Sequence, residues 1–146
     1  MDIISQSDIL IHAATVEELN RFYKSMAEKS RAAPSDQLFS ARQGDSTIAA
    51  VRLLKYESFI LIRSLYVDPV QRCSGIGTRL MSQVLSNIKQ TDSQLVIAIP
   101  TPMAITLYQK LGFSPLKPEA IPQQLQSAYR RVRRSDQGAP VMAIQL

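Results

Sequence analysis

Two glycines stand between a strongly apolar stretch and a helical pattern, in the segment Val67–Leu80. Gly75 and Gly77 carry no side chains, so a ligand can approach the backbone closely there. The first N–H groups of a helix have no partner within the helix, and the helix dipole is positive at that end. The pattern therefore predicts an anion site that would fit a phosphate or pyrophosphate.

Two familiar phosphate-binding motifs do not fit this segment. No Gly-Lys-Ser/Thr follows the glycines, which excludes a Walker loop. Leu80 stands where a dinucleotide-binding fingerprint would have its third glycine. The alternative to an anion site is a glycine-rich turn that serves only tight packing between strand and helix.

The elements next to this turn follow from hydrophobic periodicity. Residues 58–67 are apolar on both faces, which predicts a strand in the middle of a sheet. We expect one face to carry Phe59, Leu61, Leu65 and Val67, and the other to carry Ile60, Ile62 and Tyr66. Apolar residues between Ile76 and Ile88 recur at helical spacing, so an amphipathic helix follows the turn.

The rest of the chain alternates between strand and helix patterns. Strands are predicted at residues 8–13, 37–43, 47–56, 95–99 and 141–146 and around Phe113, and helices at residues 16–29, 103–111 and 122–134. Thr15 and Glu18 form a capping box before the first helix. Hairpins come first and crossovers later, so the predicted fold is α/β, with a mixed, mostly antiparallel central sheet and helices on both faces. One domain is expected to span residues 1–146.

The composition excludes several classes of protein. Of 146 residues, 45% are hydrophobic and 20% charged, as in ordinary globular proteins. A single cysteine, Cys73, and a single histidine, His12, exclude an internal disulfide framework and zinc sites built on several cysteines or two histidines. No apolar run approaches the roughly 18–20 residues of a membrane span, and residues 1–5 lack a secretory-signal pattern. We therefore expect a cytoplasmic protein with no metal and no membrane partner.

The net charge of +5 is concentrated near the carboxyl terminus. Residues 121–146 hold four arginines and one carboxylate, Asp136. The four form the arginine cluster Arg130, Arg131, Arg133 and Arg134. Such a cluster attracts phosphates, nucleic acid or acidic partners, or is a solvated helix face. No recognition-helix or zinc-finger pattern accompanies it, so nucleic acid is not an expected partner.

Two segments together resemble the GNAT superfamily of N-acetyltransferases. The run Arg72-Cys73-Ser74-Gly75-Ile76-Gly77 is similar to the family's Gln/Arg-x-x-Gly-x-Gly/Ala signature between a strand and a helix. The run Ala104–Phe113 is similar to its Ala-x-x-Leu-Tyr-x-x-x-Gly-Phe segment. The order of predicted elements also resembles the family from residue 8 to residue 146. The resemblance implies acetyl-CoA as the donor.

The resemblance also implies where the donor binds. The pyrophosphate would meet the backbone of the phosphate loop, which comprises Arg72, Cys73, Ser74, Gly75, Ile76, Gly77 and Thr78. The pantetheine would lie along the end of the central strand, where Leu65, Tyr66 and Val67 offer backbone hydrogen bonds. In the family this strand and the next splay apart into a slot for the acyl arm. A backbone N–H near Tyr66 would polarise the thioester carbonyl.

Tyr108 occupies the position of the family's usual general acid, which donates a proton to the leaving thiolate. Two departures from the family accompany it. Thr101 stands where many members bind pantetheine through an asparagine. The central strand carries no carboxylate to act as a base. The base is left open among Glu57, Asp68 and His12.

The implied function is an N-acetyltransferase that moves acetyl directly from acetyl-CoA to a primary amine in a ternary complex. The acceptor, a small molecule or a peptide, is not identified, and self-association as a homodimer is left open. The missing strand carboxylate and Thr101 motivate an alternative, a catalytically degenerate acyl-CoA-binding regulatory domain. A nucleic-acid-associated role through the arginine cluster is a second alternative.

Overall fold

The computed structural model describes residues 8–90, 94–135 and 140–146, and the segment 1–5 considered above for a signal sequence lies outside them. The described strands form a seven-stranded sheet in the order β1-β2-β3-β4-β5-β7-β6. Within it, β4 and β5 are parallel, and every other neighbouring pair is antiparallel. The predicted mixed, mostly antiparallel sheet is confirmed.

The predicted order of elements is also confirmed. The strands are β1 (Ile9–Ala13), β2 (Gln37–Gln43), β3 (Ser46–Lys55), β4 (Ile60–Val67), β5 (Leu95–Ala98), β6 (Ser114–Pro115) and β7 (Met142–Gln145). The α-helices are α1 (Val16–Ser25), α2 (Ile76–Lys89), α3 (Ile105–Lys110) and α4 (Gln126–Ser135). Short 3-10 turns cover Pro69–Gln71, Pro102–Ala104, Pro118–Ala120 and Gln123–Leu125, and three of them begin with proline, which suits a first helical position.

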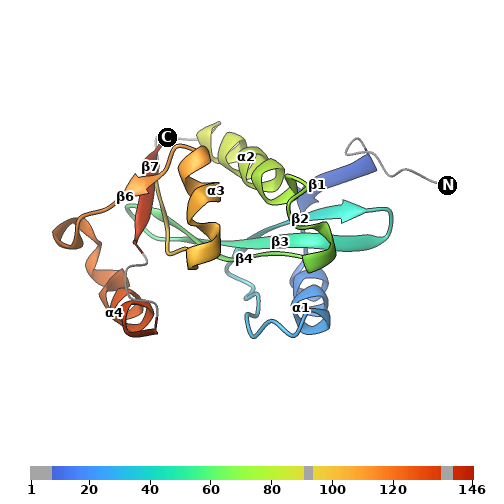
Figure 1. The fold of residues 1–146 in the computed structure, drawn as a ribbon, viewed down its shortest axis with the longest axis horizontal. Coiled ribbons are helices and arrows are strands. Elements are labelled where there is room, and N and C mark those ends of the chain that lie inside the picture. Colours follow the sequence, from blue (N-terminus) through green and yellow to red (C-terminus); the bar gives the residue numbers. More distant parts are fainter. Residues whose placement is uncertain (1–7, 91–93, 136–139) are drawn as a thin grey trace.

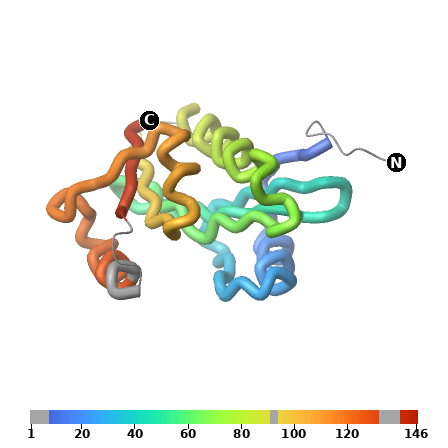
Figure 2. Tube along the Cα trace, viewed as in Figure 1, coloured from blue at the N-terminus to red at the C-terminus, as the bar shows by residue number. Residues whose placement is uncertain are grey.

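Helices cover both faces of the sheet (Figure 1). Helices α2 and α3 lie on one face, and α1 and α4 lie on the other, at opposite ends. The first face buries the largest core, which includes Leu80, Met81 and Val84 from α2. On the second face, Phe22 of α1 and Leu125 beside α4 belong to two separate clusters. The chain from α1 to β2 also runs beneath the sheet on this second face (Figure 2), and its Ala32 belongs to the cluster of Phe22.

Helix α1 ends earlier than predicted. Its start is as expected, because the Glu18 N–H donates to Thr15 Oγ1 at 3.1 Å. The Glu18 carboxylate, however, does not accept from the Thr15 N–H as in a complete capping box. It accepts from the hydroxyls of Ser40 and Thr47 instead. The helix ends at Ser25 rather than near Lys29, because Ala27 adopts a left-handed conformation (φ 57°). The Glu28 N–H then donates to Tyr23 O at 2.8 Å, which turns the chain back under the sheet.

Strand β4 contains a β-bulge that the hydrophobic pattern did not predict. Ala50 pairs with Tyr66 and Arg52 pairs with Arg63, so two residues of β4 face a single residue of β3. The bulged residue Ser64 has a positive φ of 59°.

The bulge exchanges the two faces of the strand beyond it. Leu65 and Val67 pack into the same core as Ile60 and Ile62, under α2 and α3. The predicted grouping of Leu65 and Val67 with Phe59 was therefore wrong, because strict alternation holds only in a regular strand.

Candidate active site

Strands β4 and β5 separate in the middle of the sheet. Their pairing runs from Ile60↔Val96 to Ile62↔Ala98 and stops there. Beyond Ile62 the edge of β4 that faces β5 has no strand partner in the described sheet. Ala98 is also the last residue of β5, so the open edge of β4 begins where β5 ends.

A cavity of about 210 Å³ opens at this divergence. We call it the β4–β5 cavity. Its walls come from four segments: the bulge of β4, the turn after β5, the chain after α1, and the start of α3 with its preceding turn. The residues that line it include Arg63, Ser64, Leu65, Thr101, Tyr108 and Glu28. Leu65, Thr101 and Tyr108, which the sequence predicted from different segments, thus meet in one cavity.

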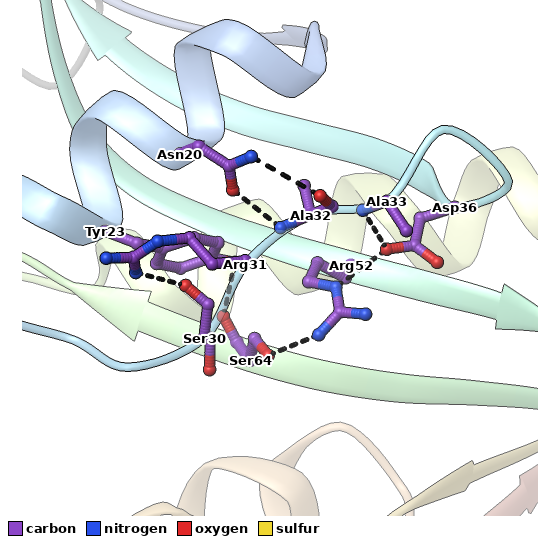
Figure 3. A network of polar contacts seen from close by, with 9 residues as sticks. All are labelled: Asn20, Tyr23, Ser30, Arg31, Ala32, Ala33, Asp36, Arg52 and Ser64. Atoms are coloured by element: carbon purple, nitrogen blue, oxygen red, sulfur yellow. Dashed lines mark hydrogen bonds and ion pairs between the residues drawn. The ribbon is translucent and has the colours of Figure 1, made fainter.

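A buried polar network holds the bulge that forms one wall (Figure 3). Tyr23 Oη donates to the Ser64 carbonyl at 2.7 Å, and Arg52 Nη1 donates to Ser64 Oγ at 3.2 Å. Arg52 Nε also donates to Asp36 Oδ2 at 2.8 Å, and that oxygen accepts from the Ala33 N–H at 2.9 Å. Burial raises the pKa of Tyr23 well above its usual range, so its hydroxyl remains a donor. These bonds offset the cost of a positive φ at a residue other than glycine.

Tyr108 is both a core residue and a wall of the cavity. Its side chain is only 3% exposed and packs edge-to-face on Phe113, with ring centroids 5.1 Å apart. Burial raises the pKa of Tyr108 well above its usual range, so the phenol is protonated at neutral pH. Among the described residues its hydroxyl has no hydrogen-bond partner. The hydroxyl is thus available as a donor to a bound molecule.

The phosphate loop lies where β4 ends and α2 begins. Gly75 is the N-cap of α2 in a left-handed conformation (φ 84°), and Cys73 just before it is left-handed too (φ 67°). With glycine at the cap, no side chain caps the first turn of α2. The N–H groups at this helix end are therefore suited to an anion.

Gly77 has a packing role that the sequence left open as an alternative. A Cβ at this position would lie 2.9 Å from Leu107 Cδ1 of α3 and 3.4 Å from Val67 Cγ2 of β4. Gly77 therefore lets α2 approach α3 and β4 closely. The two glycines have different tasks, and Gly75 is the one whose backbone conformation shapes the loop.

Arg72 is fixed against the end of β4. Its Nε donates to the Val67 carbonyl at 3.0 Å, and its guanidinium lies 5.0 Å from the centre of the Tyr66 ring. The Tyr66 ring in turn contacts Phe22 of α1, at 6.1 Å between centroids. A positive charge is thus held beside the phosphate loop.

The structure adds a carboxylate that sequence reasoning missed. Glu28 lines the β4–β5 cavity together with Tyr108. Its Oε1 accepts from the N–H and the hydroxyl of Ser30, both at 3.2 Å. No sequence pattern indicates this placement, because a helix predicted to extend to residue 29 leaves Glu28 on a helix surface. Only the early, left-handed end of α1 brings it under β4.

The three residues considered as the base do not line this cavity. Glu57 is exposed in the turn before β4. Asp68 accepts from the Val70 N–H at 3.0 Å and so caps the 3-10 turn after β4. His12 lines a different cavity, of about 570 Å³, beside α1 and the β2–β3 hairpin.

Across residues 8–90, 94–135 and 140–146, no three His, Cys, Asp or Glu side chains gather as metal ligands would. In the same ranges no helix has the length and apolar character needed to cross a membrane.

Comparisons with known proteins agree with this geometry. A family model described as an acetyltransferase (GNAT) domain matches residues 9–126. A comparison with curated protein sequences finds no significant match. A GNAT-family acetyltransferase from Staphylococcus aureus Mu50 has a similar structure, with a TM-score of 0.70 at 15% identity over 94% of this chain and 99% of that one.

Two other solved structures share the fold. The ribosomal-protein-S18-alanine N-acetyltransferase of Escherichia coli has a TM-score of 0.65 at 15% identity, over 94% of this chain and 93% of that one. The N-acetylglutamate synthase of Neisseria gonorrhoeae has a TM-score of 0.69 at 15% identity, over 94% of this chain but only 35% of the longer synthase chain. Because the family model covers most of the sequence, the chain belongs to the GNAT acetyltransferase family.

Proposed function

We propose that the chain transfers an acetyl group from acetyl-CoA to a primary amine held in the β4–β5 cavity. The observation that carries this proposal is the meeting of Tyr108 and Glu28 in one cavity at the divergence of β4 and β5. One is a protonated acid and the other a carboxylate. Solved structures of this fold support the choice of donor, since the Neisseria synthase is described as complexed with coenzyme A and N-acetyl-glutamate, and Rv2747 of Mycobacterium tuberculosis as complexed with CoA.

The residues present fit acetyl-CoA. The unpaired edge of β4 beyond Ile62 offers backbone groups to which the pantetheine amides can bond as a neighbouring strand would. The phosphate loop and Arg72 offer backbone donors and a positive charge for the pyrophosphate. Thr101 contributes a hydroxyl at the cavity wall. When bound, acetyl-CoA supplies the acetyl group as a thioester, with a thiolate as the leaving group.

Glu28 and Tyr108 account for the protons. An ammonium acceptor must first lose a proton, which Glu28 accepts directly or through water. The amine nitrogen then bonds to the carbonyl carbon, the C–S bond breaks, and Tyr108 donates a proton to the sulfur. The nitrogen loses its second proton to solvent as the amide forms, and solvent returns one proton to Tyr108. Glu28 then releases the proton that it accepted to solvent, so one proton is released overall.

Tyr108→Phe is expected to lower turnover on the order of 100-fold, the low end for general acid–base catalysis, because a thiolate already leaves readily. The phenyl ring keeps its edge-to-face contact with Phe113, so acetyl-CoA affinity should not change. Steady-state kinetics together with calorimetric titration of acetyl-CoA measure both quantities. Turnover within about twofold of the parent would mean that Tyr108 serves packing alone.

Glu28→Gln is expected to lower turnover at neutral pH on the order of 100-fold, because the amide cannot accept the ammonium proton. Activity should recover as pH rises through the acceptor's own pKa, where the free amine needs no base. Glu119→Gln, the same change on an exposed residue, is the control and should match the parent. Equal pH–rate profiles for Glu28→Gln and the parent would remove Glu28 from the mechanism.

The alternative of an inactive acyl-CoA-binding domain makes a different prediction. Such a domain would bind acetyl-CoA but release no thiol with any amine. A thiol-release assay over a panel of primary amines therefore decides between the two functions. Release that depends on the amine and is lost in Tyr108→Phe supports acetyl transfer.

A further inference from the structure

We propose that the acceptor is a small molecule of the amino-acid class, in which Arg63 binds a carboxylate while the amine lies toward Glu28 and Tyr108. This inference rests on the proposed acetyl transfer and names the substrate class of the same cavity.

Arg63 is an uncompensated positive charge in the cavity wall. Arg63 is one of the residues that line the β4–β5 cavity, and no carboxylate among the described residues pairs with it. Directly across the β3–β4 ladder stands Arg52, which is already paired with Asp36 at 2.8 Å. Like charges opposite one another in a sheet are unfavourable, so an anion bound beside Arg63 would relieve this repulsion.

The pKa of Arg63 reflects its surroundings. Partial burial and the nearby charges of Arg52 and then Arg131 lower this pKa. A guanidinium nevertheless stays charged at neutral pH. Because Arg52 is paired with Asp36, the positive charge offered to an acceptor on this side of the cavity is that of Arg63, and a cationic acceptor such as a polyamine would be repelled from it.

A zwitterion matches both charges of the cavity. Arg63 presents two parallel N–H groups, the geometry that binds a carboxylate with two hydrogen bonds. Glu28 is the only carboxylate among the described residues that line the cavity, and it is the complementary partner for an ammonium group. A molecule with an amine and a carboxylate a few bonds apart satisfies Arg63 and Glu28 together. A peptide amino terminus lacks the adjacent carboxylate.

The test compares matched acceptors. Thiol release from acetyl-CoA is measured with L-amino acids, with their carboxamides, with phosphoethanolamine and with a polyamine. The parent should prefer each good amino acid to its carboxamide by about 10- to 100-fold in kcat/KM, the usual value of a charge-assisted hydrogen bond. Equal rates for acid and amide, or a preference for phosphoethanolamine, would overturn the amino-acid class.

Variants assign the preference to Arg63. Arg63→Gln should lose most of the preference for the acid, and Arg63→Lys should retain part of it. Arg21→Gln makes the same change on an exposed arginine that lines the other cavity, and it should keep the full preference. An acid preference that survives in Arg63→Gln would contradict the assignment.

A binding measurement separates this inference from the proposed function. If no amine releases thiol, acetyl transfer fails as the function. Calorimetric titration of N-acetyl-amino acids and their amides into the CoA-loaded protein still reports on the cavity. Tighter binding of the acids, lost in Arg63→Gln, would support carboxylate recognition, and equal affinities would refute it.

Discussion

Arg52→Met is expected to lower the free energy of unfolding by about 3–5 kcal/mol, the usual cost of removing one partner from a buried ion pair. The Asp36 side chain is 4% exposed and that of Arg52 is 15% exposed, so water cannot replace the lost guanidinium. Methionine keeps most of the apolar stem of arginine, which confines the change to the charge and its hydrogen bonds. Among the described residues, the Asp36 carboxylate would retain only the Ala33 N–H as a donor.

Arg42→Met provides the matched control. Arg42 Nε lies 3.9 Å from Glu18 Oε2, and its side chain is 36% exposed, so this pair should contribute only about 0–1 kcal/mol. The double variant Arg52→Met/Asp36→Leu should recover much of the loss, because it leaves no unpaired charge. Urea unfolding of the four proteins measures the differences. Equal losses of unfolding free energy in Arg52→Met and Arg42→Met would mean that the Asp36–Arg52 pair stabilises the protein no more than the exposed Glu18–Arg42 pair does.

The same variant links stability to the cavity. Arg52 donates to Ser64 Oγ, and Ser64 is the bulged residue that also binds Tyr23 through its carbonyl. Part of the lost unfolding free energy should therefore come from the missing hydrogen bond between Arg52 and the bulged residue Ser64. The network shows how β4 can depart from regular pairing with β3 where the cavity opens. A bulge interrupts the hydrogen bonds of the ladder, and here Tyr23 of α1 donates to the Ser64 carbonyl while Arg52 of β3 donates to the Ser64 hydroxyl.

Local patterns were enough to predict the elements and the glycine-containing turn between β4 and α2. The helix after Gly75 has a regular apolar stripe, and the glycines precede it directly in sequence. The bulge at Ser64 has no such signature. One extra residue in β4 reverses the faces on which the later side chains of the strand lie, but it requires no particular residue type. The pairing of β3 with β4 decides it, and this is a long-range property.

Glu28 was missed for a related reason. The end of α1 is set by Ala27 in a left-handed conformation, which its residue type does not indicate, since glycine or asparagine usually occupies such a position. The Asp36–Arg52–Ser64 network likewise joins three segments that only the folded sheet brings together. A motif singled out Tyr108, which lines the cavity, whereas the place of Glu28 and the shape of the cavity wall depend on tertiary structure.

Gly75→Asp is expected to weaken acetyl-CoA binding by several hundred-fold compared with Gly75→Asn. The two side chains have the same shape, and both tolerate the left-handed conformation of this position (φ 84°) better than other residues do. They differ by one negative charge at the N-cap of α2. Unit charges about 4 Å apart near a protein surface interact by about 4 kcal/mol, so a carboxylate here would repel a pyrophosphate strongly.

The stability of the protein without ligand should change in the opposite direction to its affinity for acetyl-CoA. A negative charge at a helix N-terminus stabilises the helix by about 0.3–1 kcal/mol, so Gly75→Asp should melt no lower than Gly75→Asn in the absence of ligand. A loss of affinity in the more stable variant cannot result from misfolding. The gap in affinity should also narrow in 1 M salt, where the screening length falls to about 3 Å. Calorimetric titration of acetyl-CoA at two salt concentrations measures these effects, and equal affinities of the two variants at low salt would place the pyrophosphate away from this loop.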